Sequence, residues 1–236
     1  NELSEQRIVK SLDSFREIEG RLLAKNKITK VLIGGSPYDE TSKFNNFILH
    51  QKNNAILKII DAQRVSAKKN GWGFVDFNEP MRKISLEEQK RDSTFTFCRV
   101  DRIHPDNDGQ MVMAYLFLKA QGLAGYEVSE FSIDAQHLDV IVHKNCKISK
   151  LKRGKKNLTF DYLAYALPYP LDSIPRHGWG NMKSQRDAMQ LVPFMKEFNQ
   201  ERFQVHNLEK GIYQLTIDDQ YIDCLLYTSD AADDLT

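Results

Sequence analysis

The stretch Ile28-Thr-Lys-Val-Leu-Ile-Gly-Gly35 decides the fold class. It is short, rich in aliphatic residues and closed by two glycines, which is typical of a buried strand in a parallel sheet. Pro37 follows the glycines and ends the strand, because proline marks turns and loops. We therefore expect a strand here, and the neighbouring segments decide what covers it.

Both flanking segments have the periodicity of amphipathic helices. Residues 4–25 form the first predicted helix, with Ser4 as its N-cap. Its apolar residues recur at helical spacing: Ile8, Val9, Leu12, Phe15, Ile18, Leu22 and Leu23. Residues 44–69 form the second predicted helix, which Asn70-Gly71 closes as a C-cap.

The same alternation continues to residue 122. A second strand is predicted over 72–77, a short helix over 81–91, a polar loop over 93–108, and a well-buried helix over 110–121. Helices that alternate with strands indicate an α/β fold with a parallel sheet. Two strands alone cannot bury both faces of such a sheet, so we expect its remaining strands upstream of this chain.

The pattern of apolar and polar residues changes after Gly125. Segments 138–142, 158–165 and 213–217 alternate apolar and polar residues at period two, which predicts half-buried strands. Turns are expected at Gly154 and at Asp218-Asp219. Residues 184–199 could hold a helix that Pro193 starts or breaks.

Three segments follow from this change of pattern. Residues 1–124 are predicted to be the C-terminal part of an incomplete three-layer α/β/α domain of flavodoxin-like type. Residues 125–224 are predicted to be a small β-rich extension. Residues 225–236 (LLYTSDAADDLT) resemble a translated adapter, so we expect a non-native tail that packs poorly.

The charge balance of the chain bears on two classes of partner. The 236 residues include 33 basic and 32 acidic side chains, for a net charge of +1. This balance gives no electrostatic reason to expect nucleic acid or an anionic membrane as a partner. The three cysteines, Cys98, Cys146 and Cys224, have no zinc-ligand spacing, and one disulfide among them remains open.

The strongest chemical signal is Asp101-Arg-Ile-His104-Pro105, followed by Asp106-Asn-Asp-Gly109. An aspartate three residues before a histidine can accept the imidazole Nδ1–H on a tight loop. That bond fixes the tautomer in which Nε2 can take a proton from a hydroxyl nucleophile. Taken alone the motif is short, and a solvated surface histidine is the alternative.

Residues 99–114 resemble the last signature block of the SGNH (GDSL-type) hydrolases, in which an Asp and a His close the triad before the final helix. Ile33–Glu40 is similar to the strand and loop after the family's Gly-x-Asn-Asp block, and Phe74–Met81 to its last core strand. Resemblance extends over about 4–122. Segments 163–170, 191–198 and 211–218 are similar to a C-terminal extension found in a subset of the family.

The resemblance implies a serine esterase that hydrolyses an acyl ester, acetyl included, of a carbohydrate or other small molecule. It assigns Asp101 as the triad acid and His104 as the general base. It requires no metal or organic cofactor, and it implies an extracellular or periplasmic location. The family's Gly-Asp-Ser nucleophile and its Gly-x-Asn-Asp block do not occur in this sequence. We therefore expect the nucleophile upstream of Asn1 and little ester turnover by the chain alone.

Other candidate residues have ordinary structural explanations. Ser36 follows a strand, but Tyr38 replaces the last glycine of Gly-x-Ser-x-Gly, so we interpret Ser36 as a turn residue. Asp76 is interpreted as structural. His137, His143 and Cys146 match no common metal site.

Two features of the β-rich half leave binding open. A basic run is interpreted as a solvated hairpin, with polyanion contact as the alternative: Lys147, Lys150, Lys152, Arg153, Lys155 and Lys156. Trp179 near His177 could stack on a sugar or pack locally. The alternative functions are therefore a carbohydrate- or protein-binding β module on an inactive hydrolase remnant, or a truncated reading frame without activity.

Overall fold

The computed structural model describes residues 5–45, 47–99, 101–176 and 182–227. The chain forms two compact units. The first comprises Asn1–Leu123 and Leu171–Val192, and the second comprises Ala124–Pro170 and Pro193–Thr236. The prediction that residues 125–224 form one extension is therefore wrong for residues 171–192, which belong to the first unit.

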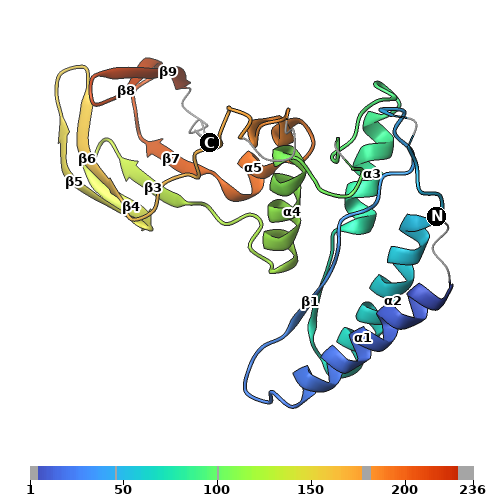
Figure 1. Ribbon diagram of the computed structural model, residues 1–236. Helices are drawn as coiled ribbons and strands as arrows, with labels where there is room; N and C mark the ends of the chain where they lie inside the picture. The colour runs from blue at the N-terminus through green and yellow to red at the C-terminus, as the bar shows by residue number, and fades with distance from the viewer. Residues whose placement is uncertain (1–4, 46, 100, 177–181, 228–236) are drawn as a thin grey trace. The chain divides into compact units, whose positions relative to one another are not determined.

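The first unit is a mixed α/β structure (Figure 1). Its elements are α1 (Glu5–Leu23), β1 (Val31–Gly34), α2 (Lys52–Asn70), β2 (Gly73–Asp76), α3 (Asn78–Glu88), α4 (Asn107–Ala120) and the 3₁₀-helix η1 (Arg186–Gln190). Strands β1 and β2 pair in parallel, from Val31 opposite Gly73 to Gly34 opposite Asp76. This parallel pair confirms the α/β class expected from the alternating pattern.

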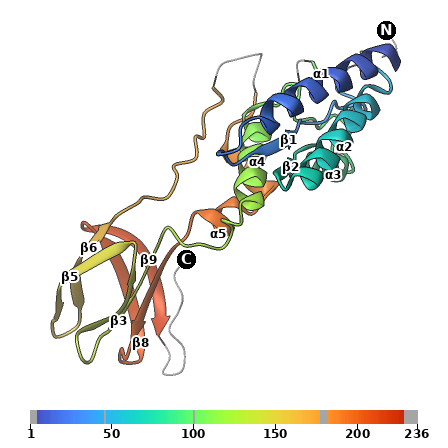
Figure 2. The ribbon, with the colours of Figure 1, turned by 90° about the horizontal axis from the view of Figure 1, so that it is seen from below.

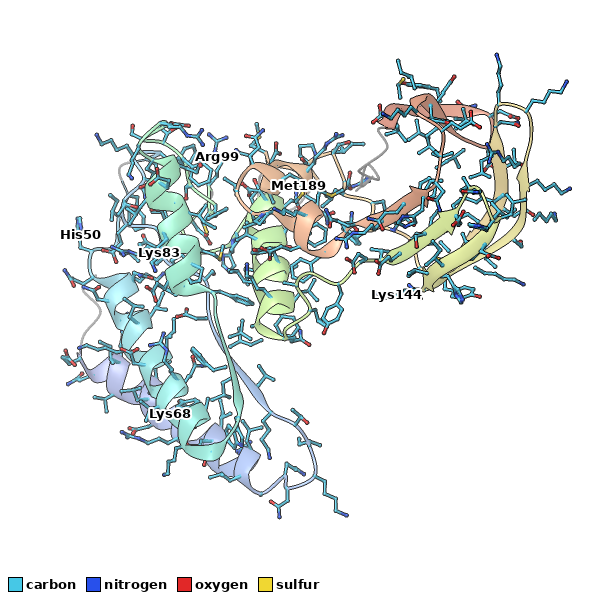
Figure 3. All side chains as sticks on the ribbon, turned by 180° about the vertical axis from the view of Figure 1, so that it is seen from behind. His50, Lys68, Lys83, Arg99, Lys144 and Met189 are labelled. Atoms are coloured by element: carbon cyan, nitrogen blue, oxygen red, sulfur yellow. The ribbon has the colours of Figure 1, made fainter. Side chains whose placement is uncertain are left out.

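Helices lie on both sides of the β1–β2 pair. Both views place α4 on one side and α1 with α2 on the other (Figures 1 and 2). Phe15 of α1, Leu32 of β1 and Ala67 of α2 form a buried cluster, against which Trp72 and Phe74 pack. The periodicity of α1 is thus confirmed for the buried Ile8 and Phe15, whereas Val9, Ile18 and Leu23 of the predicted apolar set are exposed. Lys68 of α2 and Lys83 of α3 are exposed on the surface of this unit (Figure 3).

Strand β1 is buried on one face only. Leu32 and Gly34 are buried, whereas Val31 and Ile33 are 45% and 43% exposed. The expectation of a strand buried on both faces is therefore wrong for this part of the chain. Two apolar β-branched side chains therefore remain exposed on the other face of the strand.

Helix α2 begins eight residues later than its periodicity predicted. Gln51 has a left-handed backbone (φ 63°), which separates the helix from the segment before it. Tertiary hydrogen bonds hold that segment instead: Leu49 N donates to the Tyr38 hydroxyl at 3.0 Å, and Gln51 N donates to Glu40 at 3.1 Å. At the other end Gly71 caps the helix with φ 65°, as Asn70-Gly71 predicted.

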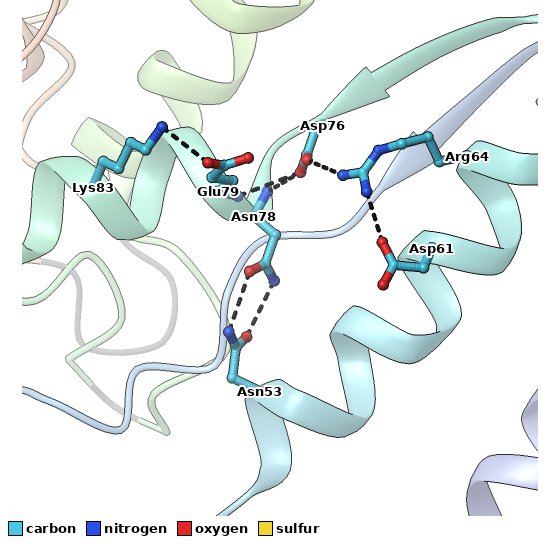
Figure 4. A network of polar contacts seen from close by, with 7 residues as sticks. All are labelled: Asn53, Asp61, Arg64, Asp76, Asn78, Glu79 and Lys83. Atoms are coloured by element: carbon cyan, nitrogen blue, oxygen red, sulfur yellow. Dashed lines mark hydrogen bonds and ion pairs between the residues drawn. The ribbon is translucent and has the colours of Figure 1, made fainter.

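Asp76, at the end of β2, has the structural role expected of it (Figure 4). Its Oδ1 accepts the Asn78 N–H at 2.9 Å and the Glu79 N–H at 3.3 Å, which satisfies two free amides at the start of α3. Its Oδ2 pairs with Arg64 at 2.7 Å. Below it, the buried side chains of Asn53 and Asn78 exchange two hydrogen bonds of 3.2 and 3.1 Å. These contacts join α2, β2 and α3.

The second unit is rich in strands (Figure 2). Its elements are β3 (Ser129–Asp134), β4 (Asp139–Lys144), β5 (Cys146–Arg153), β6 (Leu158–Ala164), α5 (Phe194–Phe198), β7 (Glu201–His206), β8 (Gly211–Ile217) and β9 (Gln220–Tyr227). Strand β3 pairs antiparallel with β4 and parallel with β7, and β5–β6 and β8–β9 are antiparallel hairpins. The hairpin strands were expected, whereas β3 and β7 were not.

An aromatic stack forms the core of this unit. The ring of Phe131 lies 4.6 Å from Phe203, 5.0 Å from Tyr162 and 5.7 Å from Phe160, measured between centroids. Ile133 and Cys146 are buried beside the stack. Rings at these separations contribute beyond the area they bury, so Phe131 is the central packing residue of the unit.

Two boundaries differ from expectation. Residues 184–199 form η1 and the separate helix α5, whose N-cap is Pro193, because proline cannot continue a helix. Strand β9 continues through Tyr227, which pairs with Gly211, so the predicted tail from 225 begins inside a strand. The remainder of that tail, 228–236, lies outside the described residues.

Asp218 and Asp219 form the predicted turn, with φ of 48° and 62°.

All three cysteines are free thiols. Cys98 and Cys146 are buried, whereas Cys224 is exposed. None of the helices in the described ranges is both long enough and apolar enough to cross a bilayer.

Candidate active site

The candidate site is the loop that enters α4. Two backbone hydrogen bonds fold the loop over buried residues: Arg102 N–H donates to the Cys98 carbonyl at 3.0 Å, and Asp106 N–H donates to the Phe97 carbonyl at 2.7 Å. Phe97 and Cys98 are each 2% exposed. Asp106 then caps α4. The loop is thus fixed at both ends, and Asp101 and His104 lie between them.

Asp101 binds His104 through both side chain and backbone. Its Oδ2 accepts a hydrogen bond from His104 Nδ1, while its Oδ1 accepts the amides of Ile103 and His104 at 3.0 and 2.9 Å. Partial burial works to raise the pKa of Asp101, but these hydrogen bonds outweigh it and the pKa lies below the ordinary range. Asp101 is therefore ionised at neutral pH and holds the imidazole by Nδ1.

This arrangement can do what a triad acid and base require. With Nδ1–H bound to a carboxylate, Nε2 is the ring nitrogen that can accept a proton, and the carboxylate stabilises the imidazolium that results. The imidazole is accessible, because the His104 side chain is 59% exposed and Asp101 is 31% exposed. The structure thus brings together the two residues that the motif predicted.

Ser36 lies beside this loop. The serine follows the end of β1, is half-buried, and donates from Oγ to the Ile103 carbonyl at 3.4 Å. This contact places the His104 loop at the carboxyl end of β1. In α/β folds, ligands bind at the carboxyl ends of parallel strands. The Ser36 hydroxyl is directed at a backbone carbonyl, which fits the turn role expected for it.

Arg102, between the acid and the base, was not anticipated. Its backbone is left-handed (φ 65°), which costs a residue with a Cβ on the order of 1–2 kcal/mol. Its side chain is buried, with 2% of the residue exposed. The guanidinium donates to the carbonyl oxygens of Asp39, Ser42, Asn45 and Phe47. Those bonds stabilise an otherwise strained conformation.

The start of α4 packs tightly on the loop. A Cβ at Gly109 would lie 2.7 Å from Cβ of Pro105 and 3.1 Å from Phe97, closer than atoms approach without displacement. Only glycine therefore lets the first turn of α4 lie this near the residue after His104.

Residues 182–183 also bind this end of α4. Asp106 Oδ2 accepts the amides of Met182 and Lys183 at 2.8 and 3.1 Å, and Asn107 Nδ2 donates to the Lys183 carbonyl at 2.9 Å. Met182 and Lys183 thus bind Asp106, which lies two positions after His104. Sequence patterns gave no signal for this contact, since it joins residues 76 or more positions apart.

A second carboxyl, that of Asp108, lies in the first turn of α4 after the loop. Asp108 is fully buried, and its Oδ2 has no hydrogen-bond partner among the described residues. Burial raises the pKa of Asp108 to about 7, although a bond from the Gly109 amide opposes the rise. Burial likewise raises the pKa of the Cys98 thiol far above its ordinary value, so Cys98 is not a thiolate nucleophile.

The second unit contains another Asp-x-x-His turn. Asp134 Oδ2 binds His137 Nδ1 at 3.0 Å, and its Oδ1 accepts the amides of Gln136 and His137 at 2.8 and 2.9 Å. The bond to Asp134 raises the pKa of His137 above its ordinary value. These contacts repeat those of Asp101 and His104. Pairing of this kind is therefore a property of the local turn, and it does not by itself distinguish the two sites.

The remaining candidates are dispersed. His143 lies on β4 opposite Phe131, and Cys146 is buried at the start of β5. Within the described ranges no three His, Cys, Asp or Glu side chains gather as a metal site would need. The basic run lies on the β5–β6 hairpin, where Lys150 pairs with Asp161 at 2.7 Å. Trp179 and His177 lie outside the described residues.

A separate cavity of about 250 Å³ opens near the N-terminal end of α2. Residues 37–41, Asn53, Asn54, Leu57, Arg82 and Ser85 line it. Neither Asp101 nor His104 is among these lining residues. Geometry of the Asp101–His104 loop, rather than this cavity, therefore defines the candidate active site.

Comparison with known proteins gives one close structural likeness. The chain is 48% identical to a solved structure described as BT4096, a gut microbial diltiazem-metabolizing enzyme, with a TM-score of 0.84. The likeness covers 94% of this chain and 50% of that one, so this chain spans about half the length of its neighbour. No family model matches the sequence, and no curated protein matches it.

Proposed function

We propose that this chain is the C-terminal part of a serine ester hydrolase of the SGNH (GDSL) type. Asp101 orients His104, and His104 serves as general base for a serine that lies on polypeptide preceding this chain. The observation that carries the proposal is the Asp101–His104 pair, with three hydrogen bonds to one carboxylate, at the carboxyl end of β1.

The mechanism follows from the tautomer that Asp101 imposes. His104 Nε2 takes the proton of the serine hydroxyl as the oxygen attacks the ester carbonyl, and it returns that proton to the departing alkoxide. Water then attacks the acyl-enzyme with His104 again as base, which releases the acid and restores the serine. Asp101 keeps its charge throughout and stabilises the imidazolium at each stage, because its pKa lies below the ordinary range.

The fold supports this assignment in two ways. Helices on both sides of β1–β2 are the outer layers expected of a three-layer α/β/α domain (Figure 1). The exposed Val31 and Ile33 form an apolar sheet face that further polypeptide of such a domain would cover. We propose that strands preceding this chain complete the sheet and supply the serine and the oxyanion donors.

The substrate class is proposed from the neighbour. That protein is described as diltiazem-metabolizing, and diltiazem is a drug with ester and amide bonds. Hydrolysis of an acyl ester of a small molecule is the reaction that a Ser-His-Asp triad would perform on such a compound. Carbohydrate esters belong to the same chemical class and remain a proposed substrate beside drug-like esters.

Ester hydrolysis by the protein that contains this chain and the polypeptide before it tests the proposal. We expect p-nitrophenyl acetate to be hydrolysed, and His104→Ala to lower kcat/KM by several orders of magnitude. His137→Ala is the matched control, since His137 has the same local pairing and should leave the rate unchanged. A His104→Ala protein as active as the parent would refute the assignment. Mass spectrometry of diltiazem incubations would identify the bond that is cut.

A further inference from the structure

The two Asp-x-x-His turns show which features are needed to pair the aspartate with the histidine and which are not. The inference drawn from them rests on the proposed function. Asp134 pairs with His137 although Ala135, the residue between them that corresponds to Arg102, is not among the described residues with positive φ. The left-handed backbone and the guanidinium of Arg102 are therefore not needed for an aspartate to bind a histidine three residues later. Arg102 must be explained by something other than the pair itself.

The side-chain hydrogen bonds of Arg102 all go to described residues of one segment, 39–47. Nη1 donates to the Asp39 and Ser42 carbonyls at 2.9 and 3.0 Å, Nε to the Phe47 carbonyl at 2.8 Å, and Nη2 to the Asn45 carbonyl at 2.5 Å. Asn45 Oδ1 accepts from Nε and Nη2 as well, at 3.2 and 3.1 Å. The Arg102 carbonyl in turn accepts the Asp39 amide at 2.9 Å. A planar guanidinium with fixed donors suits such a set of acceptors, and an ammonium does not.

The segment 39–47 is itself fixed to the first unit. Glu40 accepts the Asn53 amide of α2 at 2.7 Å, and Asn53 Oδ1 accepts the Tyr38 amide at 3.1 Å. Arg99, labelled in Figure 3, lies over the ring of Phe44 at 4.7 Å. The segment begins five residues after β1 ends at Gly34, so Arg102 joins the His104 loop to the chain that leaves the carboxyl end of the parallel strand.

We propose that Arg102 is a positioning residue for ester hydrolysis: its buried guanidinium sets where the Asp101–His104 pair lies relative to the segment that follows β1. Arg102 does not touch the substrate in this role. It acts through the loop, by holding the base at the place where the serine proton must be collected. Small displacements of a base matter, since an error of about 1 Å can cost on the order of 100-fold in rate.

Two variants test the role in the protein assayed above. Arg102→Gly tolerates the left-handed backbone and removes the guanidinium, while Arg102→Lys keeps the charge but not the fork. We expect each to lower kcat by about 10- to 100-fold with KM little changed. The pair itself should survive, so the NMR resonance of His104 Nδ1–H should match that of the parent protein.

Controls keep the outcomes distinct. Ala135→Gly, in the matching position of the second turn, should leave kcat unchanged. Asn45→Ala removes only a side-chain acceptor and should lower kcat by a smaller factor, which provides an answer if Arg102→Gly does not fold. Unchanged kcat in both Arg102→Lys and Asn45→Ala would overturn the proposal. So would loss of the Nδ1–H resonance together with activity, which would mean that Arg102 holds the pair and does not place it. Full activity of His104→Ala would instead refute the proposed function.

Discussion

The Ser36 hydroxyl donates to the carbonyl of Ile103, 3.4 Å away, and so joins the end of β1 to the residue before His104. A serine beside a general base invites assignment as the nucleophile. Its hydroxyl is instead directed at the backbone. We predict that Ser36→Ala changes the rate of p-nitrophenyl acetate hydrolysis by less than about tenfold, the effect of losing one neutral hydrogen bond of about 1 kcal/mol. Loss of several orders of magnitude would make Ser36 the nucleophile.

Asp101→Asn should show how far ester hydrolysis depends on the carboxylate that binds His104. The amide keeps the size of the carboxylate, but it favours the wrong imidazole tautomer, so we expect kcat to fall by about 10³- to 10⁴-fold. Steady-state kinetics of ester hydrolysis measure the effect. Asp134→Asn is the matched control in the second turn and should leave kcat as it is. Equal losses in the two variants would mean that the pairing serves stability alone.

Gly109→Ala should disturb the loop from below. The added methyl would lie 2.7 Å from Cβ of Pro105, so α4 and the loop must move apart. We expect a loss of stability on the order of 1–3 kcal/mol, the range typical of overpacking, and a lower kcat because His104 is next to Pro105. Urea unfolding and kinetics measure the two effects. Gly20→Ala, where a Cβ meets nothing within 4 Å, is the control and should not destabilise the protein.

Asp108 should give the protein a pH-dependent stability. Its pKa is raised from an ordinary 3.8 to about 7, so the folded state holds a proton that the unfolded state releases above about pH 4. Stability should therefore fall as pH rises from about 4 to 7, by a total on the order of 4 kcal/mol. Asp108→Asn cannot titrate and should flatten this dependence in urea unfolding between those pH values. An identical slope in both proteins would contradict the assignment.

Periodicity predicted those helices and strands whose apolar residues follow a regular pattern along the chain. Strands β1 and β2, helix α4 and the two hairpins were predicted as elements of the right type, although β1 is buried on one face only. Helix α2 was predicted too long because residues 44–51 have helical spacing in the sequence, whereas Leu49 and Gln51 donate their amides to Tyr38 and Glu40. Strand β3 was missed because two of its six residues are serines, Ser129 and Ser132, which are buried at 1% and 4% exposure. Tertiary contacts decide such segments, and a single sequence does not contain them.

The site was predictable to the same extent. The spacing of Asp101 and His104 indicated their pairing, because the turn between them is local. Arg102 gave no signal, since left-handed positions more often hold glycine, asparagine or aspartate, and buried positions rarely hold arginine. Its role depends on carbonyls about 60 residues earlier in the chain. Nor did sequence reveal that Asp106 binds the amides of residues 182 and 183.

The return of residues 171–192 to the first unit has a consequence for biosynthesis. On the ribosome, Asp106 emerges long before the amides of Met182 and Lys183 that it binds. Strands β3 to β6 must be translated in the interval. The loop that bears His104 therefore acquires its full set of contacts only late in synthesis, and a nascent chain released after Leu123 would lack them.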